Sequence, residues 1–237
     1  MATLTRTLKQ NNLMIYAALL VALLALLVLS PAEATLGNVV KIVYAHGAAE
    51  RISSYAYLMA GGLGVVSLSL RAFGKQSPTW KGTASQTPLA TLVPHVTVPE
   101  LRHSHAGVTL ERWTQAVTET AIVFWIAQFV ISAPAQVLAW GAFTLDEPRV
   151  AGALWILALT ALIYVVARWI GEKMWMSFAA IANAAIYVIV LHGEVNILHP
   201  FDPILGSDSL AIKIFYAAIV ITMGFIAFQF ARDRAQS

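Results

Sequence analysis

The sequence has no cysteine and few charged residues, and both shortages limit what the protein can be. Without cysteine the chain has no disulfides, no thiolate metal sites, no iron–sulfur clusters and no covalently attached haem. Any metal or haem would therefore be held by histidine, methionine or carboxylate side chains. Charged residues make up 11% of the 237 residues, whereas a soluble domain has about 25%. Because 59% of the residues are hydrophobic, the composition indicates a membrane protein.

Six apolar segments are long enough to cross a bilayer, which requires about 20 residues of helix. The period-two alternation of a membrane barrel is absent from them. We therefore predict an all-α polytopic membrane protein with six transmembrane helices, forming a single membrane domain over residues 1–237. The predicted spans are Leu13–Ser30, Ser54–Phe73, Ala116–Ala139, Ala151–Ile170, Met174–His192 and Ser209–Phe230. The first span precedes an A-x-A pattern at residues 32–34, but its apolar run is longer than a usual signal core, so we expect it to be retained.

The distribution of basic residues predicts the orientation of these spans, because Lys and Arg are enriched on the cytoplasmic side. Of the 15 Lys and Arg residues, four flank the spans on one side, and the other eleven lie on the side of the two termini. Both termini are therefore predicted to be cytoplasmic, together with a loop insert over residues 74–115 whose histidines His95, His103 and His105 we interpret as loop residues. The predicted outside segments are 31–53, 140–150 and 193–208.

The segment that precedes the second span is itself apolar. Residues 39–44 read VVKIVY, an apolar patch that is interrupted by Lys41. A long lysine side chain can extend to the polar side of such a patch. We therefore predict that this segment lies along the outer membrane interface and turns into the second span near Ser54.

Two histidines on different predicted outside loops are the main candidates for a binding site. His46 is followed by Gly47 and two alanines, and these small neighbours allow a flat ligand to approach the imidazole. The stretch LHGEVNILHP, residues 191–200, contains His192, Glu194 and His199. Because both loops lie on the same side of the membrane, His46 and His199 could bind one haem iron from opposite faces. The main alternative is that they are polar caps at the ends of spans.

Charged and aromatic residues in the same loops would complete such a site. Arg51 and Arg149 are expected at the aqueous edge, where they could pair with the haem propionates. The second outside loop also contains Trp140 and Asp146. The alternative interpretation of this loop is an interfacial tryptophan followed by a proline turn.

The sequence around these candidates resembles a known family. KIVYAHGAA before the second span, an outside loop with Trp-Gly followed by Asp and Arg, and NILHP after the fifth span are similar to motifs of the haem-handling proteins of cytochrome c assembly, in particular the cytochrome c maturation protein C family. The resemblance covers the six spans without the cytoplasmic insert. It implies a protein of the bacterial inner membrane that binds haem b non-covalently and delivers it to apocytochromes, without enzyme activity. The implied partners are membrane lipid, other membrane subunits or cytochrome assembly components, and a c-type cytochrome.

The resemblance also implies roles for individual residues. His46 and His199 would be the axial ligands of the haem iron, His192 a neighbour of the site, and Asp146 the end of the family's tryptophan-rich motif, which begins here at Trp140. The chain departs from the family inside this motif, because it lacks the several tryptophans expected between Trp-Gly and Asp. The residues at those positions are Ala142, Phe143, Thr144 and Leu145.

Three functions stay open from the sequence. The first is haem delivery on the outer face. The second is a recruited haem b or structural subunit of a larger respiratory or photosynthetic electron-transfer complex, since a bis-histidine iron transfers electrons without binding oxygen. The third is a structural bundle without haem. A delivery protein is expected to lose its haem to an apo-acceptor, whereas a fixed redox subunit is expected to keep it.

Overall fold

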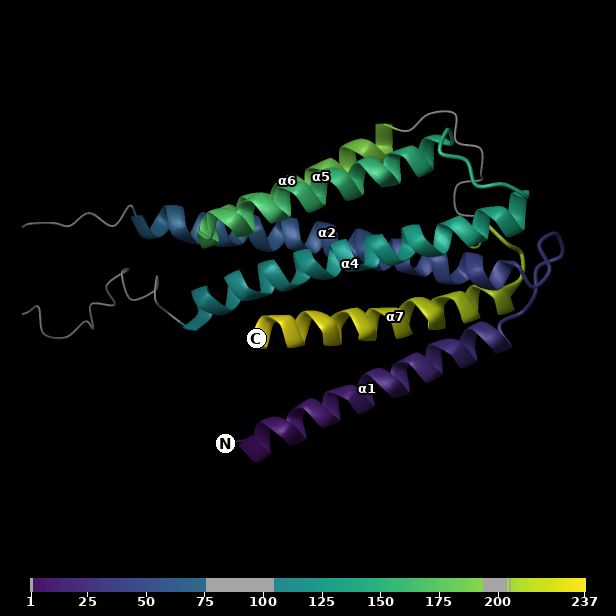
Figure 1. Ribbon diagram of the computed structural model, residues 1–237, viewed down its shortest axis with the longest axis horizontal. Helices are drawn as coiled ribbons and strands as arrows, with labels where there is room; N and C mark the ends of the chain where they lie inside the picture. The colour runs from purple at the N-terminus through teal and green to yellow at the C-terminus, as the bar shows by residue number, and fades with distance from the viewer. Residues whose placement is uncertain (1, 76–104, 194–203, 205) are drawn as a thin grey trace, which may run out of the picture.

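A computed structural model describes residues 2–75, 105–193, 204 and 206–237, and these parts of the chain form six α-helices (Figure 1). Each helix contains a stretch of at least 18 residues that is long and apolar enough to cross a membrane. The predicted all-α fold with six transmembrane helices is therefore confirmed. The helices are α1 (Ala2–Leu29), α2 (Val40–Lys75), α4 (His105–Trp140), α5 (Pro148–Ile170), α6 (Lys173–Gly193) and α7 (Leu210–Gln236).

The helices run roughly side by side along one direction (Figure 1). Helix α2 lies at the centre, in contact with α4, α6 and α7, while α5 packs on α6 and α1 packs mainly on α7. Both termini lie at the same end of the bundle as the ends of α2 and α4 that flank residues 76–104. The starts of α2, α5 and α7 lie at the opposite end, which we call the connection end. An even number of crossings requires this arrangement; which end faces the cytoplasm stays a prediction.

Helix α2 corrects the prediction for residues 39–44. Instead of lying along the interface and turning at Ser54, these residues lead directly into one unbroken helix from Val40 to Lys75. The apolar patch has helical spacing, and its inward face is buried in the bundle, with Val40 3%, Tyr44 0% and Ala48 0% exposed. Residues spaced by four lie on the same face of a helix, so the patch forms part of the core against α7 and is not a membrane-surface segment.

The connection between α1 and α2 is held by backbone-directed hydrogen bonds. The Glu33 carboxylate accepts hydrogen bonds from the backbone N–H groups of Thr35 and Leu36, both at 2.8 Å. The bonds from Leu36 and Thr35 hold the pKa of Glu33 below its usual value, because they favour the charged carboxylate. Lys41, predicted to extend to the polar side of an interfacial patch, donates from Nζ to the Val28 carbonyl at 2.6 Å and so satisfies the end of α1.

The predicted insert over residues 74–115 is partly helical. Helix α4 begins at His105, where the sequence predicted a span only from Ala116. Glu111 in this early part of α4 forms ion pairs with Arg71 of α2 and with Lys173 of α6, the latter at 3.3 Å. These pairs join three helix ends and stabilise the helical extension. His95 and His103 lie outside the described residues.

Helix α5 begins and ends with local signals that the sequence supplies. Glu147 is the N-cap and accepts a hydrogen bond from the Val150 N–H at 2.9 Å, and Pro148 occupies the first turn. Proline is favoured there because its missing N–H would have no partner in the helix. Gly171 ends the helix with φ 77°, a left-handed conformation that glycine adopts without steric cost.

We expect Glu147→Ala to destabilise the protein by about 1 kcal/mol, because it removes the acceptor that caps α5. Glu147→Asp keeps an oxygen acceptor at the N-cap and is expected to recover most of the loss. The measurement is reversible unfolding in detergent, with Asp146→Ala as the control because Asp146 is an exposed neighbour. Equal stability of Glu147→Ala and Asp146→Ala would contradict the role of the cap.

Candidate functional site

A cavity of about 480 Å³ lies at the connection end of the bundle, between α2, α4 and α5. Its volume falls within the range of about 300–1,000 Å³ that is usual for sites binding small molecules and cofactors. Much of its wall is apolar and is formed by side chains such as Tyr44, Trp125 and Leu191. The polar residues that line it are Glu33, Thr35, His46, Glu50, Gln128, Ser132, Gln136, Glu147, Arg149 and Ser207.

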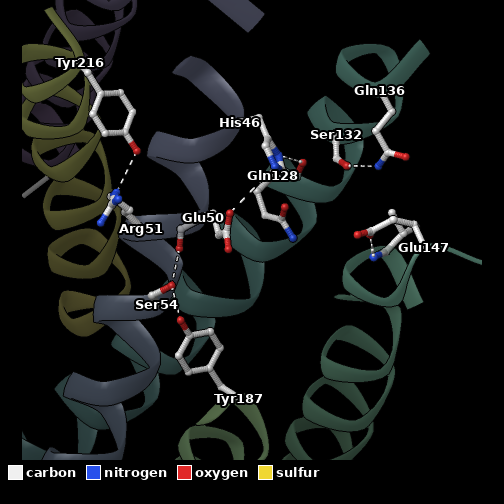
Figure 2. A network of polar contacts seen from close by, with 11 residues as sticks. His46, Glu50, Arg51, Ser54, Gln128, Ser132, Gln136, Glu147, Tyr187 and Tyr216 are labelled. Carbon is white, nitrogen blue, oxygen red and sulfur yellow. Dashed lines mark hydrogen bonds and ion pairs between the residues drawn. The ribbon is translucent and has the colours of Figure 1, made fainter. Parts of the chain in front are cut away.

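The imidazole of His46 is fixed between α2 and α4. Its Nδ1 lies 3.1 Å from the backbone carbonyl oxygen of Gln128 (Figure 2). A carbonyl oxygen only accepts hydrogen bonds, so Nδ1 must carry the hydrogen. Nε2 is then the atom that is free to bind a metal or, when protonated, to donate. A histidine that ligates a metal commonly has this arrangement, with its other ring nitrogen bonded to a carbonyl.

Glu50 lies one helical turn after His46 on the same face of α2. Its Oε2 is 4.0 Å from His46 Nε2, and the side chains of His46 and Glu50 are 23% and 25% exposed. In the part of the chain that the structure describes, no lysine or arginine forms an ion pair with this carboxylate. An ionisable group inside a membrane span is costly and is usually functional.

Arg51 points away from this cavity. Its Nε donates to the hydroxyl of Tyr216 on α7 at 2.9 Å, and its guanidinium carbon lies 5.8 Å from the centre of the Tyr216 ring. Figure 2 shows Arg51 and Tyr216 on the opposite side of α2 from Glu147. The structure therefore places Arg51 on the contact between α2 and α7, and Arg51 does not line the cavity that His46 lines.

A polar stripe on α4 forms one wall of the cavity. Gln128, Ser132 and Gln136 follow one another at intervals of four residues, and all three are buried, with 3%, 8% and 7% exposed. The Gln136 amide donates to the Ser132 hydroxyl at 2.9 Å (Figure 2). Buried amides and hydroxyls are costly unless they bond to one another, to water or to a ligand. The stripe therefore marks a place where the bundle is adapted to polar contents.

The start of α5 and the end of α4 supply the remaining predicted residues. Arg149 and Trp140 both line the cavity, and Trp140 is 54% exposed. Glu147 lines it too, but its carboxylate caps α5. Asp146 is exposed and does not line the cavity.

The structure thus brings together three of the predicted site residues, which are His46, Trp140 and Arg149. His192 is exposed, and its Nδ1 lies 2.9 Å from the carbonyl of Val188 in its own helix. His199 lies outside the described residues, so its predicted role as a ligand stays a prediction.

Sequence reasoning missed Glu50 and the stripe on α4. Glu50 was overlooked because the sequence was interpreted as an outside loop up to residue 53, although the four-residue interval between His46 and Glu50 is a helical signal. The same interval repeats between Gln128, Ser132 and Gln136 and could have indicated a polar face on the predicted third span.

The described residues can be compared with the ligands that a haem site requires. Among the described residues there is no group of three or more His, Asp or Glu side chains that could hold a metal ion. A haem iron needs only two axial ligands from the protein. His46 meets the requirements for one of them, with its Nδ1 hydrogen bonded to a carbonyl and its Nε2 free. The described residues therefore fit one half of a bis-histidine site.

The fold and the cavity define a class: a polytopic α-helical membrane protein with a largely apolar pocket, lined in part by polar side chains, at one end of its bundle. A scan against protein-family models and searches among curated proteins and solved structures found no match to this chain.

Proposed function

We propose that this chain is a haem-binding protein of the cytochrome c assembly type, located in the bacterial inner membrane. It would hold haem b on the outer face, between His46 and His199, for delivery to apocytochromes. The observation that carries this proposal is the fixed imidazole of His46, with Nδ1 bonded to the Gln128 carbonyl at 3.1 Å and Nε2 free beside the cavity.

The described residues on either side of the segment between α6 and α7 support His199 as the second ligand. Leu191 precedes and Ile204 follows the segment that contains His199, and both side chains line the same cavity as His46. Described residues on both sides of this segment therefore line the cavity. The two ligands would come from different parts of the chain, His46 from α2 and His199 from the connection between α6 and α7.

The charges around the cavity support an amphipathic ligand. Arg149 lines the cavity at the connection end, where a propionate could accept hydrogen bonds from its guanidinium. The apolar walls, including Trp125 and Tyr44, suit the face of a porphyrin. Haem would supply an iron that binds histidine reversibly, and the chain would orient the His46 ring toward it through the hydrogen bond to the Gln128 carbonyl. Trp140, 54% exposed at the same cavity, offers an aromatic edge to an acceptor protein.

Absorption spectra of the detergent-purified protein, oxidised and reduced, test haem binding. We expect the bands of low-spin haem b in the wild type after expression with sufficient haem. His46→Ala and His199→Ala should each lose these bands, because either change removes one axial ligand. His192→Ala is the matched control, since His192 is exposed and its ring bonds its own helix. It should keep the wild-type spectrum.

Absence of haem absorbance in the wild type would contradict the proposal, as would spectra that are unaffected by His46→Ala. Transfer from the loaded protein to an excess of apomyoglobin then separates delivery from a fixed redox role. We expect transfer on a timescale of minutes for a delivery protein. Retention over hours would instead favour a recruited haem b subunit of an electron-transfer complex.

A further inference from the structure

We infer that Glu50 is a positioning and tuning residue of the proposed site, and that its carboxylate stabilises bound haem in the ferric state. This inference rests on the proposed function, because it concerns an iron bound to His46. It goes beyond that function by assigning an oxidation-state preference to a residue that the family resemblance does not include.

The geometry limits the distance between Glu50 and the iron. Nε2 of His46 lies 4.0 Å from Oε2 of Glu50. A metal bound to an imidazole lies about 2 Å from the nitrogen. The iron would then be at most about 6 Å from the carboxylate oxygen, which is the sum of the two distances. This limit holds for any direction from which the iron approaches Nε2.

The other carboxylates at the cavity are already engaged in local structure. Glu33 accepts two backbone N–H groups, and Glu147 caps α5. Glu50 has no such engagement: in the described residues its carboxylate has only the 4.0 Å contact with His46. Arg51 is bonded to Tyr216 on another face of α2. The cation that lines the cavity with Glu50 is Arg149, which the proposed function assigns to a propionate.

The charge of Glu50 favours one oxidation state of the iron. Ferric iron in a porphyrin dianion carries a net positive charge, whereas the ferrous form is neutral. A carboxylate within about 6 Å attracts the ferric form, and an apolar wall weakens this attraction less than water does. Charge and polarity around the iron are among the factors through which a protein sets a haem potential. Glu50 should therefore lower the midpoint potential of the site.

A spectroelectrochemical titration of the haem-loaded full-length protein in detergent tests this inference. We expect Glu50→Gln to shift the midpoint potential to a more positive value, because the neutral amide keeps the shape but removes the charge. Glu50→Asp retains the charge and should stay close to the wild type. Glu172→Gln removes the same charge from an exposed position in the turn between α5 and α6, at the opposite end of the bundle, and should leave the potential unchanged.

Glu50→Ala is a second neutral variant, and whichever neutral variant loads haem decides the result. A potential that is unchanged in the neutral variant, or that shifts equally in Glu172→Gln, would overturn the inference and leave the proposed function intact. Failure of both neutral variants to load haem, while Glu50→Asp loads it, would also overturn the inference, because Glu50 would then be required for binding. Failure of the wild type to bind haem overturns both proposals, and the absorption spectrum shows this before any titration.

Discussion

Alanine at Gly64 is expected to destabilise the bundle by about 2–3 kcal/mol, the cost of overpacking a well-filled interior. At Gly64 an added Cβ would lie 2.7 Å from the backbone oxygen of Ser177 on α6. A backbone oxygen within a helix cannot turn aside, so α2 and α6 would have to separate. At Gly61 the added Cβ would lie 2.6 Å from the Cβ of Ala184, and the same separation is expected. Small residues at such positions allow membrane helices to approach closely.

Gly62 provides a matched control on the same helix. An added Cβ at Gly62 meets nothing within 4 Å, so Gly62→Ala should be neutral or slightly stabilising, because alanine favours a helix over glycine. The measurement is reversible unfolding of the three variants in mixed micelles. Equal effects of Gly62→Ala and Gly64→Ala would show that helix propensity, and not the contact between α2 and α6, determines the outcome.

The fold was easier to predict from the sequence than the site. The six spans follow from composition and length, which are local properties, and α5 also carries its own start and stop at Glu147, Pro148 and Gly171. The start of α2 was predicted wrongly because an apolar patch has the same composition in a membrane interface and in a helical core. What decides between them is whether Val40, Tyr44 and Ala48 find a partner helix, and that partner is α7, distant in the sequence.

The candidate site shows the same division between local and distant information. His46, Trp140 and Arg149 could be selected from the sequence because each lies near the end of a span, in a pattern that resembles a known motif. The contact between His46 Nδ1 and the carbonyl of Gln128 could not be predicted from the sequence, because it depends on how α2 and α4 are aligned along their lengths. Arg51 shows the reverse case: its position in the sequence suggested the site, but Tyr216 on α7 holds it on another face.

The largest electrostatic effect is expected at the end of the bundle that carries the termini, where Arg234→Met should destabilise the protein by about 2 kcal/mol. Glu119 of α4 has a side chain that is only 9% exposed, and it forms an ion pair with Arg234 of α7. Tyr164 of α5 donates to it at 2.6 Å, and Gln115 donates at 2.8 Å. Removal of one partner from a buried pair costs about 3–5 kcal/mol because the other charge is left uncompensated. The expected value is lower here, since the Arg234 side chain is 46% exposed and the other two donors remain.

A double-mutant cycle separates the pair from the rest of this cluster. Glu119→Gln removes the charge that Arg234 compensates, so the combined variant should be more stable than the sum of the two single changes predicts, by about 1–2 kcal/mol. Arg168→Met is the control, because Arg168 is exposed and its hydrogen bond to the cluster is a long one, to Gln115 at 3.5 Å. It should change stability by less than about 0.5 kcal/mol. If Arg234→Met destabilises the protein no more than Arg168→Met does, the ion pair does not hold α4 and α7 together. Tyr164, Gln115 and water would then be sufficient to stabilise the Glu119 carboxylate.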